Sequence, residues 1–430
     1  MFRPQNLRED AEAIRSSLKK RGQDPSLLDE ALEIDRKRRE IIEEVESLQH
    51  EQNEASEKIG QFKREGQDEK AEAMIEKTSE LKKEIEDLNE RRNELDESLE
   101  QKLLRIPNVL QDTVPEGDDE SDNRVEETVG EIPSFDFEPE PHWDLAEDQG
   151  FVDFEQAQTI SGSRFAVHHA EGARLERALI NFMLDVQTEE NGYEETMTPV
   201  LVRERTMEGT GQLPKFKDDM FQTSEDGYYL IPTSEVSLIN LYRDTILKAG
   251  DLPISKTART ACFRREAGAH GKDTRGLMRQ HQFNKVELVK ITHPDASEAA
   301  LQDLLGDARS VLEKLELPYR VVTLCAGDTG FAATKTFDLE VWIPSQDRYR
   351  EISSCSNCRA FQARRANIQY RPDPDADTQY CHTLNGSGLA IGRCWLAIVE
   401  NFQQKDGTVT IPDALRPYLD GKDSIGLPLD

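Results

Sequence analysis

Three charged residues, Arg264, Arg265 and Glu266, stand where an apolar, strand-like stretch enters a loop, and Phe283 begins the alternating stretch that follows. The loop contains three glycines, Gly268, Gly271 and Gly276. Glycine permits positive φ, so such a loop can close over a ligand. A guanidinium binds phosphate through charge-assisted hydrogen bonds, and an aromatic ring packs on a flat base. The stretch 261–287 therefore predicts a strand–loop–strand hairpin that binds a nucleotide; a solvated basic hairpin is the alternative.

Strand alternation adds detail to this hairpin. Side chains of successive strand residues point to opposite faces, so Phe283 and Lys285 are expected on one face and Asn284 and Val286 on the other.

A second group of polar residues lies in a predicted strand at 349–357. Alternation places Glu351 and Ser353 on one face of this strand. Carboxylate and hydroxyl oxygens suit Mg²⁺, a hard cation that also keeps phosphate and water ligands. This strand is therefore a candidate magnesium site.

Two further segments place polar residues at predicted helix starts. Thr233, Ser234 and Glu235 begin one helix, where a cap is the simplest interpretation. The glycine-rich stretch 386–393 ends on Arg393 and leads into an amphipathic helix.

The cysteines allow two interpretations. Cys355, Cys358, Cys381 and His382 have the composition of a zinc site. Free thiols packed in a core explain the set more simply, so we expect no structural zinc. Six cysteines in 430 residues, with no secretion signal and no apolar run long enough for a membrane span, predict a cytoplasmic protein without a membrane partner.

The chain is strongly acidic, with a net charge of -31. Nucleic acids are bound chiefly through Lys and Arg, but a local basic face can bind phosphates whatever the total charge. An acidic surface also suits a protein that stays hydrated in a salty cytoplasm, and we keep that as a hypothesis.

The clearest periodic pattern lies near the amino terminus. Apolar residues alternate in steps of three and four over residues 27–62 and again over 71–99, with a glycine-containing break at 64–67. Two helices that fold back as an antiparallel hairpin are predicted over about 26–103, and Pro107 ends the segment. A dimerisation coiled coil or a spacer is the alternative to a binding role. Four basic residues gather near the tip: Lys58, Lys63, Arg64 and Lys70.

The remaining chain divides by composition. Residues 109–150 are rich in Asp, Glu and Pro and predict an exposed acidic connection. Residues 170–190 predict an amphipathic helix, followed by a strand and Pro199. The expected domains are 1–108, the connection 109–150 and a catalytic domain 151–430.

The motifs resemble those of a known family. FRREAG, TRGL and HQFNKVE resemble motif 2 of the class II aminoacyl-tRNA synthetases, and in this wording the seryl-tRNA synthetases; GSGLAIGR resembles motif 3, and the helix with Pro199 resembles motif 1. The resemblance implies an α+β fold: an antiparallel sheet flanked by helices, with an N-terminal long antiparallel coiled-coil hairpin. It also implies a homodimer formed through motif 1.

The resemblance implies roles for individual residues. Arg264 would bridge the α-phosphate and the serine carboxylate, with Glu351 and Arg393 as the other catalytic residues. ATP-binding is implied for Arg264, Arg265, Glu266, Gln280, Phe283, Glu351, Ile352, Ser353, Ser354 and Arg393. Serine-binding is implied for Thr233, Ser234, Glu235, Glu287, Asn385 and Ser387. Mg²⁺, arriving with ATP, would be held by Glu351 and Ser354.

The implied activity is ATP-dependent activation of L-serine and its transfer to tRNA(Ser), which the hairpin would grip; tRNA(Sec) is left open as a second acceptor. Three alternatives remain. Another class II synthetase would usually carry a carboxy-terminal anticodon-binding domain, and a carrier-protein aminoacylating homologue would lack the long arm. A scaffold with an inactive catalytic domain would not need Arg264, Glu266, Glu351 and Arg393.

Overall fold

The computed structural model describes residues 2–268 and 275–429. Gly271, which we expect in the loop after Glu266, lies outside the described residues. The chain forms two compact units, one of residues 1–19 and 23–107, the other of residues 20–22 and 108–430.

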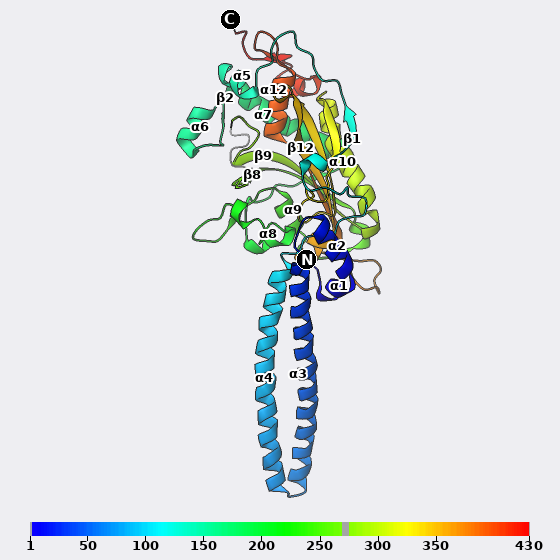
Figure 1. Cartoon of the computed structure of the whole chain (residues 1–430). Helices are drawn as coiled ribbons and strands as arrows, with labels where there is room; N and C mark the ends of the chain where they lie inside the picture. Colours follow the sequence, from blue (N-terminus) through cyan, green and yellow to red (C-terminus); the bar gives the residue numbers. More distant parts are fainter. Residues whose placement is uncertain (1, 269–274, 430) are drawn as a thin grey trace. The chain divides into compact units, whose positions relative to one another are not determined.

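The first unit is built on a helical hairpin (Figure 1). Helices α3 (Ser26–Arg64) and α4 (Asp68–Leu103) pack along their length, and the turn between them falls at the predicted break. Ile41 and Val45 pack against Ile85 and Leu88 in the seam, while Arg38 forms an ion pair with Asp96. The short helices α1 (Pro4–Glu9) and α2 (Ala11–Lys20) precede the hairpin.

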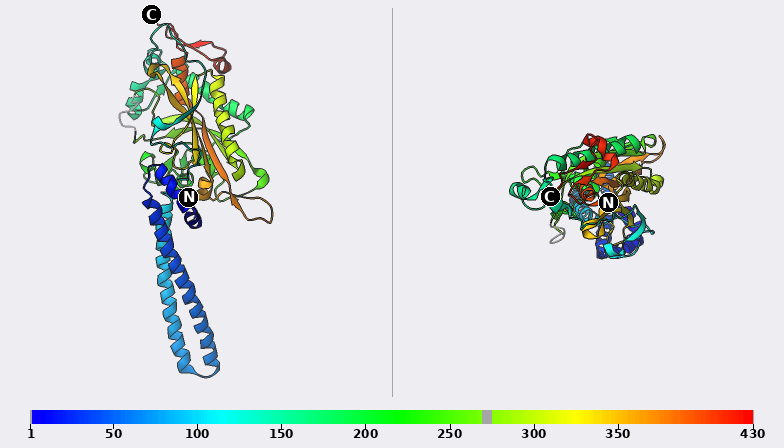
Figure 2. Two further views of the ribbon diagram at one scale, coloured as in Figure 1. Left: turned by 45° about the vertical axis from the view of Figure 1, so that its right-hand side comes forward. Right: turned by 90° about the horizontal axis from the view of Figure 1, so that it is seen from above.

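The second unit is organised around an eight-stranded sheet (Figure 2). In spatial order its strands are β1 (Arg124–Val129), β10 (Tyr319–Thr323), β11 (Lys335–Ile343), β12 (Arg348–Arg359), β15 (His382–Ala390), β9 (Gln282–Thr292), β8 (Ile254–Phe263) and β4 (Glu194–Glu195). All neighbours are antiparallel except β4 and β8. The expected connection 109–150 thus also contributes an edge strand.

Smaller elements complete this unit. The remaining strands are β2 (Val152–Asp153), β3 (Val167–His168), β5 (Leu201–Val202), β6 (Tyr229–Leu230), β7 (Ile246–Lys248), β13 (Gln369–Arg371), β14 (Gln379–Tyr380), β16 (Val409–Thr410) and β17 (Ser424–Ile425). Its helices are α5 (His142–Asp148), α6 (Phe154–Ser161), α7 (Ala170–Asp185), α8 (Glu204–Thr210), α9 (Glu235–Asn240), α10 (Ser297–Lys314), α11 (Ala360–Ala366) and α12 (Ile391–Asn401). The predicted class, a helix-flanked antiparallel sheet with a long N-terminal helical hairpin, is confirmed.

The sheet is covered on both faces, and β9 shows how. Val286 and Leu288 join the large core formed with α7, α10 and α12, whereas Val289 and Ile291 join a second core cluster. Because side chains alternate along a strand, Glu287 is on the face of Val289, opposite the large core. The strand thereby separates a packed face from a face that is free to carry polar side chains.

A β-bulge in β12 corrects one expectation. Leu339 of β11 pairs with Ser353, but the next residue, Glu340, pairs with Glu351, so Ile352 is extra. The extra residue reverses the alternation, and Glu351 consequently shares a face with Ser354 rather than with Ser353. Simple alternation missed this because a bulge leaves no periodic sign in the sequence.

Within the described parts of the chain, no helix has the length and apolar character needed to cross a membrane.

Candidate active site

Two adjoining cavities open on the polar face of the sheet. A narrow cavity of about 200 Å³ is lined by every residue implicated above in binding ATP or serine, except Arg265, Ser353 and Ser234. A wide cavity of about 580 Å³, more open to solvent, adjoins it. The two share Thr233, Glu235, Arg264, Glu266 and Asn385 in their walls.

Arg264 emerges at the end of β8, where Cys262 pairs with Phe283 of β9. Its Nε donates to the carbonyl of Pro232 at 3.3 Å, and its guanidinium lies 5.3 Å from the centre of the Phe283 ring. The cation and the ring thus line the same cavity, as binding of a phosphate and a base together requires.

Arg265 is oriented differently from its neighbour. Its Nε donates to the carbonyl of Met220 at 2.9 Å, and its guanidinium lies 4.5 Å from the Phe221 ring centre. The side chain is thus used in packing and does not line the narrow cavity.

Glu266, which also lines the narrow cavity, forms an ion pair with Arg279 at 3.1 Å. Gln280 and Phe283 line the same cavity. We did not predict Arg279 as a site residue. Its place just before the second strand of the predicted hairpin could have indicated it.

Arg393 at the start of α12 meets Glu351 of β12. Its Nη1 donates to the Glu351 carbonyl at 2.6 Å and lies 3.3 Å from the carboxylate. The side chain of Glu351 is 50% exposed; partial desolvation opposes its ionisation, but the positive charges of Arg393 and Arg264 outweigh this effect, so the pKa of Glu351 is lowered. The carboxylate is therefore an anion at neutral pH, able to bind a cation.

The residues next to Glu351 fit a hard cation. Ser354 lines the narrow cavity on the same face as Glu351. Behind them lies buried Asp338, whose Oδ1 has no hydrogen-bond partner among the described residues. Burial and the charge of Glu351 raise the pKa of Asp338. Oxygen donors of this kind suit Mg²⁺ that keeps phosphate and water ligands. Ser353, on the opposite face, donates to the Ser387 carbonyl at 2.6 Å.

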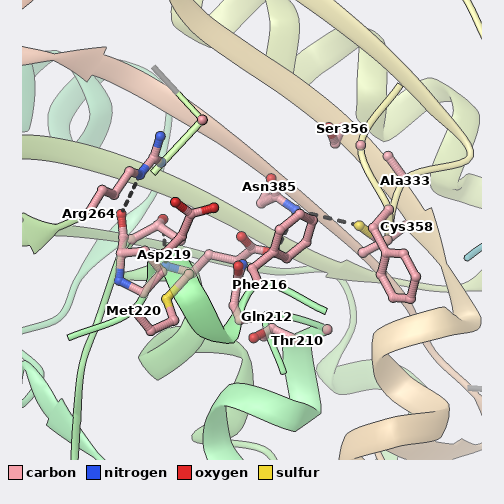
Figure 3. Close-up of a pocket in the computed structure, with 18 of the residues that line it drawn as sticks. Thr210, Gln212, Phe216, Asp219, Met220, Arg264, Ala333, Ser356, Cys358 and Asn385 are labelled. Carbon is pink, nitrogen blue, oxygen red and sulfur yellow. Dashed lines mark hydrogen bonds between the residues drawn. The ribbon is translucent and has the colours of Figure 1, made fainter. Parts of the chain in front are cut away.

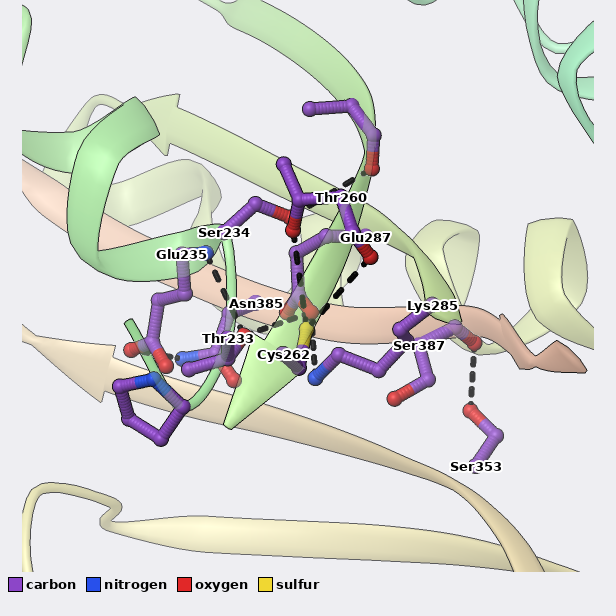
Figure 4. Close-up of polar contacts among 12 residues, drawn as sticks. Thr233, Ser234, Glu235, Thr260, Cys262, Lys285, Glu287, Ser353, Asn385 and Ser387 are labelled. Atoms are coloured by element: carbon purple, nitrogen blue, oxygen red, sulfur yellow. Dashed lines mark hydrogen bonds and ion pairs between the residues drawn. The ribbon is translucent and has the colours of Figure 1, made fainter. Parts of the chain in front are cut away.

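The floor of the narrow cavity holds a buried polar network (Figure 4). Thr233 donates to the Glu287 carboxylate at 2.8 Å, and Lys285 pairs with the same oxygen at 2.5 Å. Phe283, Lys285 and Glu287 alternate along β9, and all three line the cavity. Lys285 was missed as a site residue, although its alternation with Phe283 carried the signal.

Glu235 lies beside this network. Its Oε1 accepts from Gln362 at 2.5 Å and from Asn385 at 2.9 Å. Burial, together with the negative charge of Glu287, raises the pKa of Glu235 from 4.5 to about 7. A buried carboxylate with this pKa is half protonated near neutral pH and would be ionised by a bound cation.

Ser234 does not line either cavity. Its side chain is fully buried and donates to the Ala258 carbonyl at 3.4 Å. The expected cap at the start of α9 is made by Thr233 instead, whose Oγ1 accepts from the backbone N–H of Glu235 at 3.3 Å.

The wide cavity has an apolar side (Figure 3). Phe216 and Met220 lie on one part of its wall, and the segment 330–333 forms another. The rings of Phe216 and Phe331 are edge to face, with centres 6.2 Å apart. The cavity therefore offers apolar surface next to the polar residues Thr233 and Glu235.

All six cysteines have buried, reduced thiols. Among the residues that the structure describes, no group of three or more His, Cys, Asp or Glu side chains could hold a metal ion.

Comparison with known proteins identifies the family. Residues 215–402 match the model of the tRNA synthetase class II core domain (G, H, P, S and T), and residues 1–110 match the seryl-tRNA synthetase N-terminal domain. The chain is 51% identical to serine–tRNA ligase of Desulforapulum autotrophicum over 97% of both chains. It is 52% identical to that of Bacillus pumilus, over 97% of this chain and 98% of the relative.

The fold comparison agrees. Seryl-tRNA synthetase from Pyrococcus horikoshii, solved with ATP, superposes with a TM-score of 0.95 at 36% identity over the whole of both chains. The cytoplasmic serine–tRNA ligase of Naegleria fowleri, solved with AMP, gives a TM-score of 0.85 at 30% identity, over 97% of this chain and 95% of that one. The chain therefore belongs to the seryl-tRNA synthetase family, in its bacterial form, within class II of the aminoacyl-tRNA synthetases.

Proposed function

We propose that this protein activates L-serine with ATP and transfers it to the 3′ end of tRNA(Ser) in the cytoplasm. The observation that carries the proposal is the narrow cavity, in which Arg264, Phe283 and Arg393 lie beside Thr233 and Glu235. One wall suits a nucleotide and the adjacent wall suits an amino acid.

In the first step, a serine carboxylate oxygen attacks the α-phosphorus of ATP, and pyrophosphate leaves with the bonding electrons. The reaction needs no protein nucleophile, so the site acts by orientation and charge neutralisation. Arg264 contacts the α-phosphate and the serine carboxylate, Phe283 stacks on the adenine and Glu266 binds its edge. Arg393 holds the γ-phosphate after exchanging its contact with Glu351. Arg265 and Ser353 support the site from outside its lining.

Mg²⁺ would be held by Glu351 and Ser354, together with phosphate oxygens and water. Bound there, it neutralises charge on the phosphates. The protein contributes an ionised Glu351 and a hydroxyl on the same face, which the bulge in β12 brings together.

Serine is recognised at both ends. Its ammonium group is bound by Glu235 and Thr233, and its hydroxyl donates to Glu287, near Ser387 and Asn385. Alanine would leave the buried Glu287 without that donor, which costs free energy. Lys285 orients Glu287 through the 2.5 Å ion pair.

In the second step, the terminal ribose hydroxyl of the tRNA attacks the seryl carbonyl. The new ester bond forms as the bond to AMP breaks, AMP keeps the bonding electrons and the hydroxyl proton passes to solvent. The wide cavity gives this substrate access, because it opens to solvent and shares Thr233, Glu235 and Arg264 with the narrow one.

Two further assignments concern partners. The hairpin α3–α4 binds the tRNA, which its separate compact unit and its match to the N-terminal domain model support. A homodimer is supported by Met197 and Leu201, which are 93% and 47% exposed, and by Thr198, whose buried Oγ1 has no partner in the described residues.

The central assignment is tested by ATP–pyrophosphate exchange with each of the twenty amino acids, at low and molar KCl. Serine alone should support exchange, and higher activity in molar KCl would support the salt hypothesis. Arg264→Ala should lower the exchange rate by at least about 10²-fold, because a charge that stabilises the transition state is lost. Arg265→Ala is the matched control and should lose far less. A wild-type rate in Arg264→Ala would refute the role of Arg264.

The pKa of Glu235 predicts a pH dependence. The carboxylate must be ionised to bind an ammonium group, and its pKa in the free protein is about 7. The KM for serine should therefore fall as the pH rises from 6 to 8, while the KM for ATP changes little. Glu235→Gln should raise the KM for serine and remove its pH dependence. An unchanged profile in Glu235→Gln would show that another group titrates.

Deleting residues 30–100 should separate the two steps. Serine-dependent exchange should remain, whereas charging of tRNA(Ser) should be abolished, because the hairpin is a separate unit from the cavities. Charging assays with tRNA(Ser) and tRNA(Sec) on the intact protein also show whether tRNA(Sec) is a second acceptor of serine. Equal loss of exchange and charging in the deletion variant would contradict separate roles.

Met197→Glu should convert a dimer into a monomer in sedimentation velocity at micromolar concentration, because a charge would be buried in an apolar interface. Ile160→Glu is the control, since Ile160 is 74% exposed on α6 and should leave the dimer intact. A monomeric wild-type protein would refute the proposed homodimer.

A further inference from the structure

The five consecutive backbone carbonyls from Thr329 to Ala333 all accept hydrogen bonds from two residues that are far away in sequence. Arg21 donates to the carbonyls of residues 329, 330 and 333, and Asn108 donates to those of residues 331 and 332. Because every carbonyl of this loop is hydrogen-bonded to one of the two residues, the path of the loop is fixed.

Arg21 is a buried arginine, 8% exposed, that binds backbone rather than an acid. Its Nη1 lies 2.6 Å from the Thr329 carbonyl and 3.3 Å from that of Gly330, and its Nη2 lies 2.6 Å from that of Ala333. Its Nε donates to the Asn108 carbonyl at 3.2 Å. No carboxylate pairs with it in the described part of the chain, and burial lowers its pKa to about 10. It remains charged at neutral pH, and its planar fork matches several acceptors at once.

Asn108 completes the arrangement. Its backbone N–H donates to the Phe331 carbonyl at 2.9 Å, and its Nδ2 donates to the carbonyls of Ala332 and Cys358, each at 2.9 Å. It is also buried. Asn108 therefore connects the loop to the end of β12.

The positions of the two residues in the chain are informative. Arg21 stands between α2 and α3, and Asn108 follows α4, so they enclose the hairpin in sequence. Both nevertheless belong to the second compact unit. The chain thus leaves this unit through one of these residues and re-enters it through the other.

The loop they hold forms a wall of the wide cavity. Gly330, Phe331, Ala332 and Ala333 line that cavity, but none of them lines the narrow one. The Phe331 ring packs against Phe216 at 6.2 Å and against Phe361 at 5.7 Å between ring centres. A displacement of this loop would therefore change the space beside Thr233 and Glu235, whereas Gln280, Phe283 and Arg393 line only the narrow one of the two cavities.

We propose that Arg21 and Asn108 are positioning residues for the transfer step, which fix the wall of the wide cavity at the two points where the chain enters and leaves the tRNA-binding hairpin. The proposal rests on the proposed function, because the wide cavity is where the end of the tRNA has room to approach the seryl group. The same two residues flank the hairpin in sequence and shape the cavity in which the tRNA reacts.

The test measures the two steps separately on the full-length protein. Arg21→Gln and Asn108→Ala are compared in ATP–pyrophosphate exchange and in rapid-quench transfer from preformed seryl-adenylate to tRNA(Ser). Both variants should keep exchange within about twofold, with an unchanged KM for ATP. Both should slow transfer by about 10- to 100-fold, because small displacements from reactive geometry have effects of this size. Arg15→Gln on α2 is the matched control and should leave both steps unchanged.

Two measurements guard against a general folding defect. Asn108→Ala removes the side-chain bonds to the Ala332 and Cys358 carbonyls and a local one from the Val109 N–H, but it leaves Arg21 and its bonds to the loop in place, so it should fold even if Arg21→Gln does not. Arg21→Lys keeps the charge but loses the fork, and it should remain slow in transfer. Equal losses in exchange and transfer, unchanged transfer in Asn108→Ala, or full activity in Arg21→Lys would each overturn the proposal. Absence of serine-dependent exchange in the wild type would instead refute the proposed function.

Discussion

The antiparallel register between β8 and β9 is the constraint on which the site depends. It pairs Cys262 with Phe283 and Ala258 with Glu287, and so sets Arg264, at the strand end, beside the aromatic ring. Because strand residues alternate, Phe283, Lys285 and Glu287 all reach the cavity while their neighbours join the core. A shift of one residue would exchange these two sets, so core packing and site geometry are fixed by the same hydrogen bonds.

The protonation states of the carboxylates in this site depend on burial as well as on ion pairing. Glu287 has a lysine within 2.5 Å, whereas Glu235 accepts hydrogen bonds from the amides of Gln362 and Asn385, and burial with the charge of Glu287 raises its pKa to about 7. The positive charges of Arg393 and Arg264 lower the pKa of Glu351, which is therefore ionised. The three carboxylates of this cavity are thereby suited to different tasks. Glu287 suits a hydroxyl, Glu235 suits an ammonium group, and Glu351 suits a metal bound with phosphates.

Arg21 and Asn108 flank the hairpin in sequence, yet both belong to the catalytic unit and donate hydrogen bonds to one of its loops. A buried cation without a carboxylate costs desolvation free energy, which carbonyl dipoles offset only if they are held in place. This cost makes the arrangement geometrically demanding and suits it to fixing a loop.

The sequence by itself determined the hairpin, because heptad spacing over residues 27–99 is a local property of the chain. It also predicted Arg264 and Arg393 as nucleotide-binding candidates, and the two line one cavity. It also determined that Phe283 and Lys285 share a face. Only the tertiary structure decided which of two adjacent residues does which task. Arg265 packs on Phe221 instead of lining the cavity, and the bulge in β12 puts Ser354 rather than Ser353 on the face of Glu351. The sequence does not show either arrangement, because each depends on a contact with a distant part of the chain. Arg21 carries no local sign for the same reason, because its acceptors in the loop lie 308 to 312 residues away in sequence.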